Sequence, residues 1–135
     1  MTAPASLEPS IEEAIAAALG HGGFIEITTT GRRSGLARRI PIVFHVIGGR
    51  FYISGMPSHR RRAWLANLES EPRFTVHLVR GVGADLPATA RPIKAEGERR
   101  AVLAHVARAW GRDDVEVMVR FSPLVEFTVG PPPAA

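Results

Sequence analysis

The chain has 135 residues, no cysteine, 45% hydrophobic residues and a formal net charge of +4, which is the usual range for one soluble globular domain. A chain of this length buries roughly two thirds of its unfolded surface, so its core needs no disulfide or metal ion. The lack of cysteine excludes a disulfide framework, a thiolate zinc site, an iron–sulfur cluster and a cysteine nucleophile. We expect a single domain over residues 1–135, with an N-terminal helix and linker at 1–22 and a disordered proline-rich tail at 130–135.

The N-terminus lacks the basic and apolar regions of a secretory signal. No stretch approaches the roughly 20 apolar residues that are needed to span a bilayer. We therefore expect a cytoplasmic protein without an integral membrane segment.

The positive charge is concentrated in one part of the sequence. Residues 27–68 contain eight of the seventeen Lys and Arg residues and none of the thirteen Asp and Glu, which leaves nine basic against thirteen acidic residues elsewhere. A guanidinium donates paired hydrogen bonds to phosphate and carboxylate groups. The segment therefore predicts an anionic partner.

The first predicted element is an amphipathic helix over residues 11–20. Ser10 and Glu13 have the spacing of a capping box, and Gly20 supplies a C-terminal stop. Its apolar side chains fall on one face, so the helix is expected to pack against the rest of the domain.

Three consecutive antiparallel strands are predicted after this helix. Residues 24–30, 38–47 and 50–54 alternate apolar and polar side chains and are separated by glycine-containing turns. Residues 60–70 then have helical spacing and end before Pro72, so a helix with three arginines at its start is expected.

The C-terminal half continues with two strands, two helices and a last strand. They are predicted at residues 73–79, 84–94, 95–110, 113–121 and 124–129. Pro87 and Pro92 imply an edge or a bulge in the second of these strands. Strands in hairpin order with helices between them indicate an α+β protein, with a barrel-like antiparallel sheet and helices at its edges or ends.

The turn at residues 31–35, Gly-Arg-Arg-Ser-Gly, is suited to bind a phosphate. It lacks the Lys-Ser/Thr ending of a Walker loop and joins two strands, which argues against classical nucleotide hydrolysis. It nevertheless brings free backbone N–H groups, the Ser34 hydroxyl and the guanidiniums of Arg32 and Arg33 into one small volume. The alternative interpretation is a solvated turn with arginines for solubility.

The positions of other arginines in the predicted elements indicate where their side chains lie. Arg38 and Arg39 lie on opposite faces of a strand, and we expect Arg38 to face the turn while Arg39 lies outside. The arginines at residues 60–62 oppose the dipole of the predicted helix unless an anion binds there, which favours a functional role.

Several other kinds of site are disfavoured. The five histidines show no metal-ligand spacing, so no metal site is predicted, and the Gly-x-Ser-x-Gly pattern of serine hydrolases is absent. Aromatic residues make up only 7% of the chain, so stacking platforms for nucleic acid are scarce and no nucleic-acid partner is expected.

Three segments together resemble the deazaflavin-dependent nitroreductase family. They are residues 28–41 (TTTGRRSGLARRIP), 54–55 (SG) and 62–72 (RAWLANLESEP), and the ending at 122–126 (SPLVE) is similar too. The match runs from about Gly23 to Val129. The resemblance implies an antiparallel split β-barrel of the FMN-binding type with flanking helices. It also implies a dimer, and reduced coenzyme F420 as a hydride donor to quinones, enones or nitroaromatics.

The resemblance also implies roles for individual residues. The cofactor's phosphate and the start of its acidic tail would be held by Arg32, Arg33, Ser34 and Arg38. The deazaflavin ring would be lined by Pro41, Ile42, Ser54, Gly55 and Met56. The start of the helix would contact the ring through Ala63 and Trp64, and Asn67 would support the turn. From its helical spacing alone, Trp64 is more typical of core packing than of a ligand contact.

The chain departs from the family pattern at two places. Where relatives carry a lysine after the serine of the third strand, this chain has Gly55, and Arg60 or Arg61 would replace that cation. Some relatives place tyrosines beside the substrate in the C-terminal third, whereas Tyr52 is the only tyrosine here. The expected substrate contacts, which are equally compatible with core packing, are Tyr52, Trp110, Val117 and Phe121.

The sequence therefore predicts a homodimeric F420-dependent oxidoreductase that acts on a small molecule. No catalytic side chain is predicted, and Tyr52, Ser54 or bound water could donate the proton that accompanies the hydride. The alternative is a non-catalytic protein of the same fold that carries F420, FMN, haem or a lipid.

Overall fold

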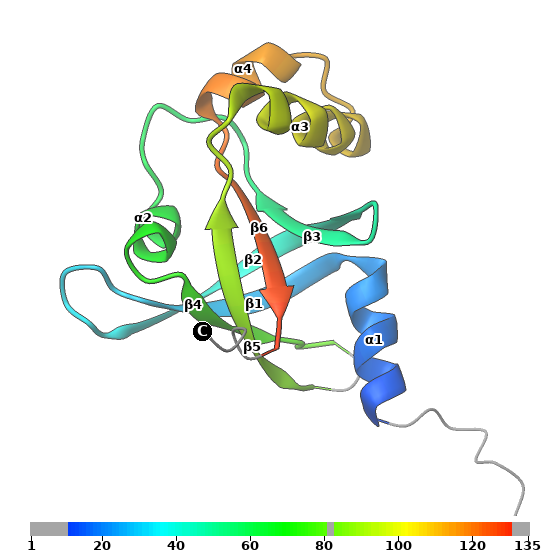
Figure 1. The fold of residues 1–135 in the computed structure, drawn as a ribbon, viewed down its shortest axis with the longest axis vertical. Helices are drawn as coiled ribbons and strands as arrows, with labels where there is room; N and C mark the ends of the chain where they lie inside the picture. The colour runs from blue at the N-terminus through cyan, green and yellow to red at the C-terminus, as the bar shows by residue number, and fades with distance from the viewer. Residues whose placement is uncertain (1–10, 81–82, 131–135) are drawn as a thin grey trace, which may run out of the picture.

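Six antiparallel strands close into a barrel because apolar side chains alternate along them and point to a common interior (Figure 1). The computed structural model describes residues 11–80 and 83–130. Its elements in chain order are α1 (Ile11–His21), β1 (Gly23–Thr30), β2 (Ala37–Ile47), β3 (Arg50–Ser54), α2 (Ala63–Ser70), β4 (Arg73–His77), β5 (Asp85–Pro92), α3 (Glu96–Trp110), α4 (Val115–Phe121) and β6 (Leu124–Val129). The order around the barrel is β1-β2-β3-β6-β5-β4, and β4 pairs back to β1. The predicted α+β class with an antiparallel barrel is confirmed.

The first of two cores fills the barrel. Phe127 lies at its centre, with its ring 5.8 Å from those of Phe44 and Phe74 and 5.4 Å from that of Phe51. Leu19 of α1 and Leu68 of α2 pack against this core from outside the sheet. The two helices thereby cover the flanks of the barrel, as Figure 1 shows.

The second core lies on the outer face of β3 and β6. Tyr52 and Leu124 point outward from these strands and pack against Leu103 and Val106 of α3 and Met118 of α4. Figure 1 shows α3 and α4 together at one end of the barrel. None of the helices in residues 11–80 and 83–130 has the length and apolar composition that a membrane crossing requires.

The start of α2 differs from the prediction. The helix begins at Ala63 and not at residue 60, and Arg62 is its extended N-cap residue. The reason is a tertiary contact: the Arg62 side chain donates a hydrogen bond to the Met56 carbonyl oxygen at 2.6 Å, which holds residues 56–62 as a loop. The helix-dipole argument therefore does not apply to Arg60 and Arg61, which precede the helix.

The prolines of β5 lie where the strand has a neighbour on one side only. Pro87 pairs with β4, before the β6 ladder begins at Ala88, and Pro92 pairs with β6, after the β4 ladder ends at Thr89. The expected edge or bulge is therefore wrong for β5 as a whole, since both sides are paired in continuous register, but each proline occupies a local edge. The predicted cap residue Ser10 and the tail at 131–135 lie outside the described residues.

Candidate functional site

A pocket of about 730 Å³ opens between β2, the turn after β1 and the first residues of α2. Its lining residues are Thr29, Gly31, Arg32, Arg33, Ser34, Arg38, Ile40, Pro41, Ile42, Ser54, Gly55, Arg62, Ala63, Trp64 and Asn67. The volume lies in the range of small-molecule sites, roughly 300 to 1,000 Å³. All the predicted cofactor-binding residues line this pocket except Met56, Arg60 and Arg61.

The strand register explains why one wall of the pocket carries both charged and apolar side chains. Arg38, Ile40 and Ile42 are alternate residues of β2 and therefore share one face of the sheet. Arg38 lies opposite Thr29 of β1, next to the turn. One wall thus presents a guanidinium beside the turn and apolar side chains farther along the strand.

Arginines at the pocket differ in their partners from several arginines elsewhere. Outside the pocket, arginines form ion pairs in the combinations Arg39 with Glu26, Arg50 with Glu126, and Arg61 with Glu69. Among the described residues, no Asp or Glu pairs with the pocket arginines, which are Arg32, Arg33, Arg38 and Arg62. The pocket therefore carries positive charge that the protein itself does not neutralise, and it is suited to an anionic ligand.

The turn between β1 and β2 is a closed loop with few free donors. The Gly31 amide donates to the Leu36 carbonyl at 2.8 Å, and the Gly35 amide donates to the Gly31 carbonyl at 2.8 Å. The Ser34 hydroxyl accepts a hydrogen bond from the Leu36 amide at 3.1 Å. A Cβ on Gly31 would lie 2.6 Å from that hydroxyl oxygen, so a larger residue would displace the Ser34 side chain from its hydrogen bond. Within residues 11–80 and 83–130, the amides of Arg33 and Ser34 have no hydrogen-bond acceptor and remain available to a ligand.

Asn67 joins α2 to this turn. Its side-chain oxygen accepts a hydrogen bond from the Arg32 amide at 3.0 Å, and its side-chain nitrogen donates to the Thr29 hydroxyl at 3.0 Å. Asn67 and Thr29 are both buried, with 6% and 2% of their surfaces exposed. The two hydrogen bonds set the position of the turn relative to α2, and with it that of the turn's guanidiniums.

Gly55 and Arg62 share one space at the pocket wall. A Cβ on Gly55 would lie 3.2 Å from Cζ of Arg62 and 3.1 Å from Cγ of Pro123. The Arg62 guanidinium occupies this space because residue 55 has no side chain. Arg62, and not the expected Arg60 or Arg61, is thus the cation beside the end of β3.

Comparison with known protein families gives a match over most of the chain. The family model for F420H(2)-dependent quinone reductases matches residues 11–119. The chain belongs to this family. No curated protein shows a significant sequence match to the chain.

Three solved structures share the fold. The F420-H2 dependent reductase FDR-A is 22% identical with a TM-score of 0.53, covering 78% of this chain and 94% of its own. A proposed pyridoxamine 5'-phosphate oxidase from Listeria innocua is 12% identical with a TM-score of 0.63, covering 90% and 95%. A third structure, described only as a domain-swapped dimer, is 22% identical with a TM-score of 0.52, covering 78% and 80%. The split-barrel architecture implied by the sequence resemblance is confirmed.

Membership of the F420H(2)-dependent quinone reductase family makes the protein an F420-dependent oxidoreductase. The pocket fits such a cofactor in two respects that the structure shows directly. Guanidiniums without internal carboxylate partners match its phosphate and acidic tail, and the apolar side chains of Ile40, Ile42 and Trp64 match a flat ring system.

Three predicted cofactor contacts lie away from the pocket lining. Met56 is 52% exposed, and its sulfur faces Arg112 at 3.5 Å. Arg61 is held by Glu69, and Arg60 lies in the loop before α2. The positions of Arg60 and Arg61 follow from the later start of α2, because these residues are not part of the helix that lines the pocket.

None of the predicted substrate contacts lines the pocket. Tyr52 and Trp110 belong to the second core, on the opposite side of the sheet from the barrel interior. Val117 is 43% exposed on α4, and the Phe121 ring packs against His59 with 4.5 Å between ring centroids. Burial, with the nearby Glu126 carboxylate, raises the pKa of Tyr52, but its buried hydroxyl does not face the pocket.

Thr29, Gly31, Ile40 and Arg62 line the pocket but were not among the predicted site residues, although Gly31 belongs to the predicted turn. The position of Ile40 at the pocket could be predicted from strand periodicity, since Ile40 lies between Arg38 and Ile42 on the same face. Thr29 and Arg62 depend on the β1–β2 register and on the loop after β3, which sequence patterns do not specify. In the described part of the chain, no three His, Asp or Glu side chains group closely enough to hold a metal ion.

Replacing Asn67 by alanine is expected to lower both stability and cofactor affinity. The change leaves the buried Thr29 hydroxyl and the Arg32 amide without their partner, at a cost of about 1 to 3 kcal/mol in the free energy of unfolding. The turn also loses its attachment to α2, so F420 binding should weaken several-fold. Urea unfolding and F420 titration measure the two effects, with Ser70→Ala on the exposed end of α2 as the control. Wild-type affinity in Asn67→Ala would show that α2 does not position the turn.

Proposed function

We propose that the protein is a quinone reductase in which the turn after β1 holds the phosphate of reduced F420 and the β2 face holds its deazaflavin ring. One observation carries this assignment: four arginines line a single pocket, and no carboxylate of the described residues pairs with any of them. A polyanionic cofactor supplies the missing negative charge. The quinone acceptor is taken from the family to which the chain belongs, and enones and nitroaromatics are further candidates.

The chain's own residues bind, orient and exclude water, while the reduced cofactor supplies the hydride. Arg33 and Arg38 would hold the phosphate through charge-assisted hydrogen bonds, together with the free amides of the turn. Ile40, Ile42 and Trp64 would exclude water from the ring and fix its plane, which orients it toward an acceptor.

Ser54 is poorly placed to protonate the product. Its hydroxyl is buried and already donates to the Pro123 carbonyl oxygen at 2.8 Å. A buried hydroxyl that donates to a backbone carbonyl stabilises the end of β3, and releasing its proton would break that hydrogen bond. We expect water to donate the proton, so Ser54→Ala should reduce stability more than it reduces the rate of hydride transfer.

Anaerobic oxidation of reduced F420 tests the proposed activity. The purified protein is mixed with reduced F420 and with 2-methyl-1,4-naphthoquinone, a cyclohexenone or a nitroarene at equal concentration. We expect rapid, protein-dependent oxidation with the quinone and slower oxidation with nitroarenes. Tight binding of F420 without oxidation by any acceptor would instead identify the non-catalytic carrier, and absence of binding would contradict both.

We also propose that the protein is a cytoplasmic homodimer. The likeness to a structure described as a domain-swapped dimer supports the dimer. Sedimentation equilibrium of the full chain should give twice the mass of 14.6 kDa. A monomer across the micromolar range would contradict this.

A further inference from the structure

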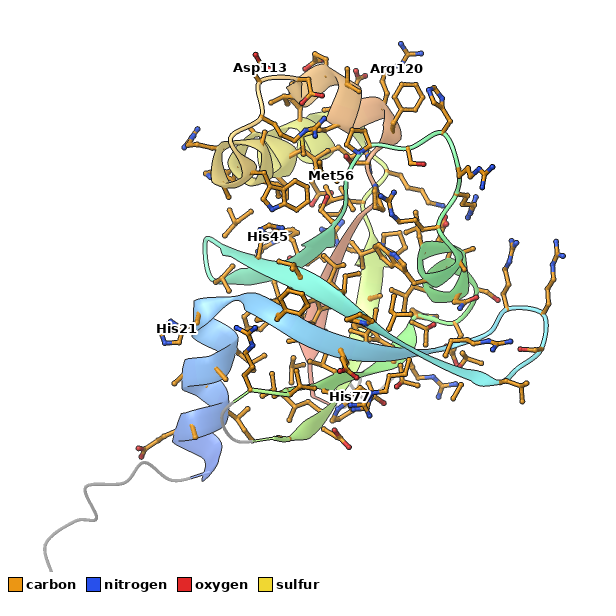
Figure 2. The ribbon with its side chains drawn as sticks, turned by 180° about the vertical axis from the view of Figure 1, so that it is seen from behind. His21, His45, Met56, His77, Asp113 and Arg120 are labelled. Carbon is orange, nitrogen blue, oxygen red and sulfur yellow. The ribbon has the colours of Figure 1, made fainter. Side chains whose placement is uncertain are left out.

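A smaller cavity adjoins the cofactor pocket. It measures about 280 Å³ and lies between the loop after β3 and the C-terminal end of α4. Its wall includes His59, Arg60, Arg62, Arg120, Phe121 and Pro123, and we call it the arginine pocket. In Figure 2, Arg120 extends from α4 at the end of the molecule opposite α1.

The arginine pocket has no acidic residue in its lining. Arg61, which also lines it, is paired with Glu69. Among the described residues, no carboxylate pairs with the exposed side chains of Arg60 and Arg120. The Arg62 guanidinium donates one hydrogen bond, to the Met56 carbonyl oxygen. The cavity therefore offers several guanidinium donors that the protein leaves unused.

Aromatic rings give this cavity a fixed apolar side. The Arg120 guanidinium carbon lies 5.2 Å from the centroid of the Phe121 ring, within the range of a cation–π contact. His59 packs against the same ring, at 4.5 Å between centroids. The site thus combines an oriented guanidinium with an aromatic surface, which suits an organic acid better than a free inorganic ion.

This cavity and the cofactor pocket share one lining residue, Arg62. Gly55 lines the cofactor pocket, whereas Pro123 lines the arginine pocket and Arg62 lines both. A Cβ on Gly55 would lie 3.2 Å from Cζ of Arg62, so the Arg62 guanidinium lies against Gly55 where the two cavities meet. A molecule that lies beside the ring-binding face and extends past Gly55 would reach the arginines.

We infer that the arginine pocket binds a carboxylate of the electron acceptor, so that the enzyme prefers anionic acceptors over neutral ones. This inference rests on the proposed function, because it assumes that the acceptor lies beside the deazaflavin ring. The same carboxylate chemistry also occurs in the acidic tail of F420. The phosphate-binding turn, however, is hydrogen-bonded to Asn67 in the middle of α2, while the arginine pocket adjoins Arg62, five residues earlier at the start of the helix. The acceptor is therefore the source that the geometry favours.

Direct binding tests the pocket without any turnover. Naphthalene-2-carboxylate and naphthalene-2-carboxamide are titrated calorimetrically into the free protein and into protein saturated with oxidised F420. We expect the carboxylate to bind more tightly than the carboxamide, and Arg120→Ala to weaken the carboxylate about tenfold. Arg108→Ala, an exposed arginine of α3 that lines neither pocket, is the matched control. Equal binding of acid and amide, or no effect of Arg120→Ala, would overturn the inference.

Steady-state kinetics then test the role in substrate selection. The acceptors are a 1,4-naphthoquinone with a carboxylate side chain and the methyl ester of the same compound. In Arg120→Ala, KM for the acid should rise about tenfold relative to the ester, with little change in kcat. A raised Kd for F420 with an unchanged acid-to-ester ratio would instead assign the pocket to the cofactor tail and overturn the inference. If no acceptor oxidises reduced F420, the proposed function fails, while the calorimetry still decides whether the pocket binds carboxylates.

Discussion

Replacing Arg33 and Arg38 together by alanine is expected to weaken F420 binding about a hundredfold or more. Each charge-assisted hydrogen bond contributes about 1.5 to 3 kcal/mol, and the loss of two exceeds the 2.7 kcal/mol that corresponds to roughly a hundredfold in Kd. No carboxylate of the described residues pairs with either side chain, so the change frees no buried acid and should leave the fold intact. Titration of oxidised F420 into the double variant measures the effect.

Arg39→Ala is the matched control for this prediction. Arg39 is the next residue of β2 after Arg38, but its side chain points to the other face of the sheet and pairs with Glu26 at 2.5 Å. An exposed pair of this kind contributes little to stability, and F420 affinity should stay within about twofold of wild type. Equal losses in Arg39→Ala and in the double variant would mean that overall charge, and not the pocket, determines the affinity.

Arg99→Met is expected to lower the free energy of unfolding by about 3 kcal/mol. The Arg99 guanidinium donates to the carbonyl oxygens of Ile93 at 2.8 Å, Val119 at 2.9 Å and Ser122 at 2.5 Å. These acceptors lie where α4 ends and where β5 leads into α3, so one side chain joins the second core to the barrel. Burial lowers the pKa of Arg99, which fits a charge held by backbone carbonyls with no carboxylate partner. Methionine keeps the apolar stem but leaves the carbonyls without their donor.

Arg100→Met is the control for the stability measurement. Arg100 is adjacent in α3 and makes exposed ion pairs with Glu96 at 2.9 Å and with Glu116 at 2.7 Å. Exposed pairs contribute about 0 to 1 kcal/mol each, so its replacement should have a much smaller effect. Urea unfolding of both variants measures the two changes in the free energy of unfolding. A similar loss for Arg99 and Arg100 would show that the buried hydrogen bonds do not hold α3 and α4 to the barrel.

Much of the barrel could be predicted because its strands carry local signals. Alternation identified β1, β2 and β3, and glycines marked their turns. The start of α2 could not be predicted, since helical spacing continues through residues 60–62 while a contact from Arg62 to Met56 keeps them out of the helix.

The candidate site was predictable where it consists of one continuous motif. The turn and β2 place Arg32, Arg33 and Arg38 at the pocket through local geometry and strand parity. Which arginines are neutralised depends on distant segments: Arg50, for example, pairs with Glu126, 76 residues later. No sequence pattern specifies such pairs, because they follow from the order of strands around the barrel.

The expected substrate contacts lie outside the pocket for a related reason. Tyr52 and Trp110 have the residue types of a ligand site, but these types are equally common in cores. The barrel has a second core on its outer face, under α3 and α4, and that core takes up both residues. Residue type alone does not distinguish the two environments.

Comparing two ligands tests the central claim most directly. Oxidised F420 and the same deazaflavin without phosphate and glutamyl tail are titrated into the wild-type protein under identical conditions. If the unpaired arginines of the turn and β2 hold the phosphate, F420 should bind at least about a hundredfold more tightly, and the difference should shrink as salt rises. Equal dissociation constants for the two ligands at low salt would contradict the cationic site.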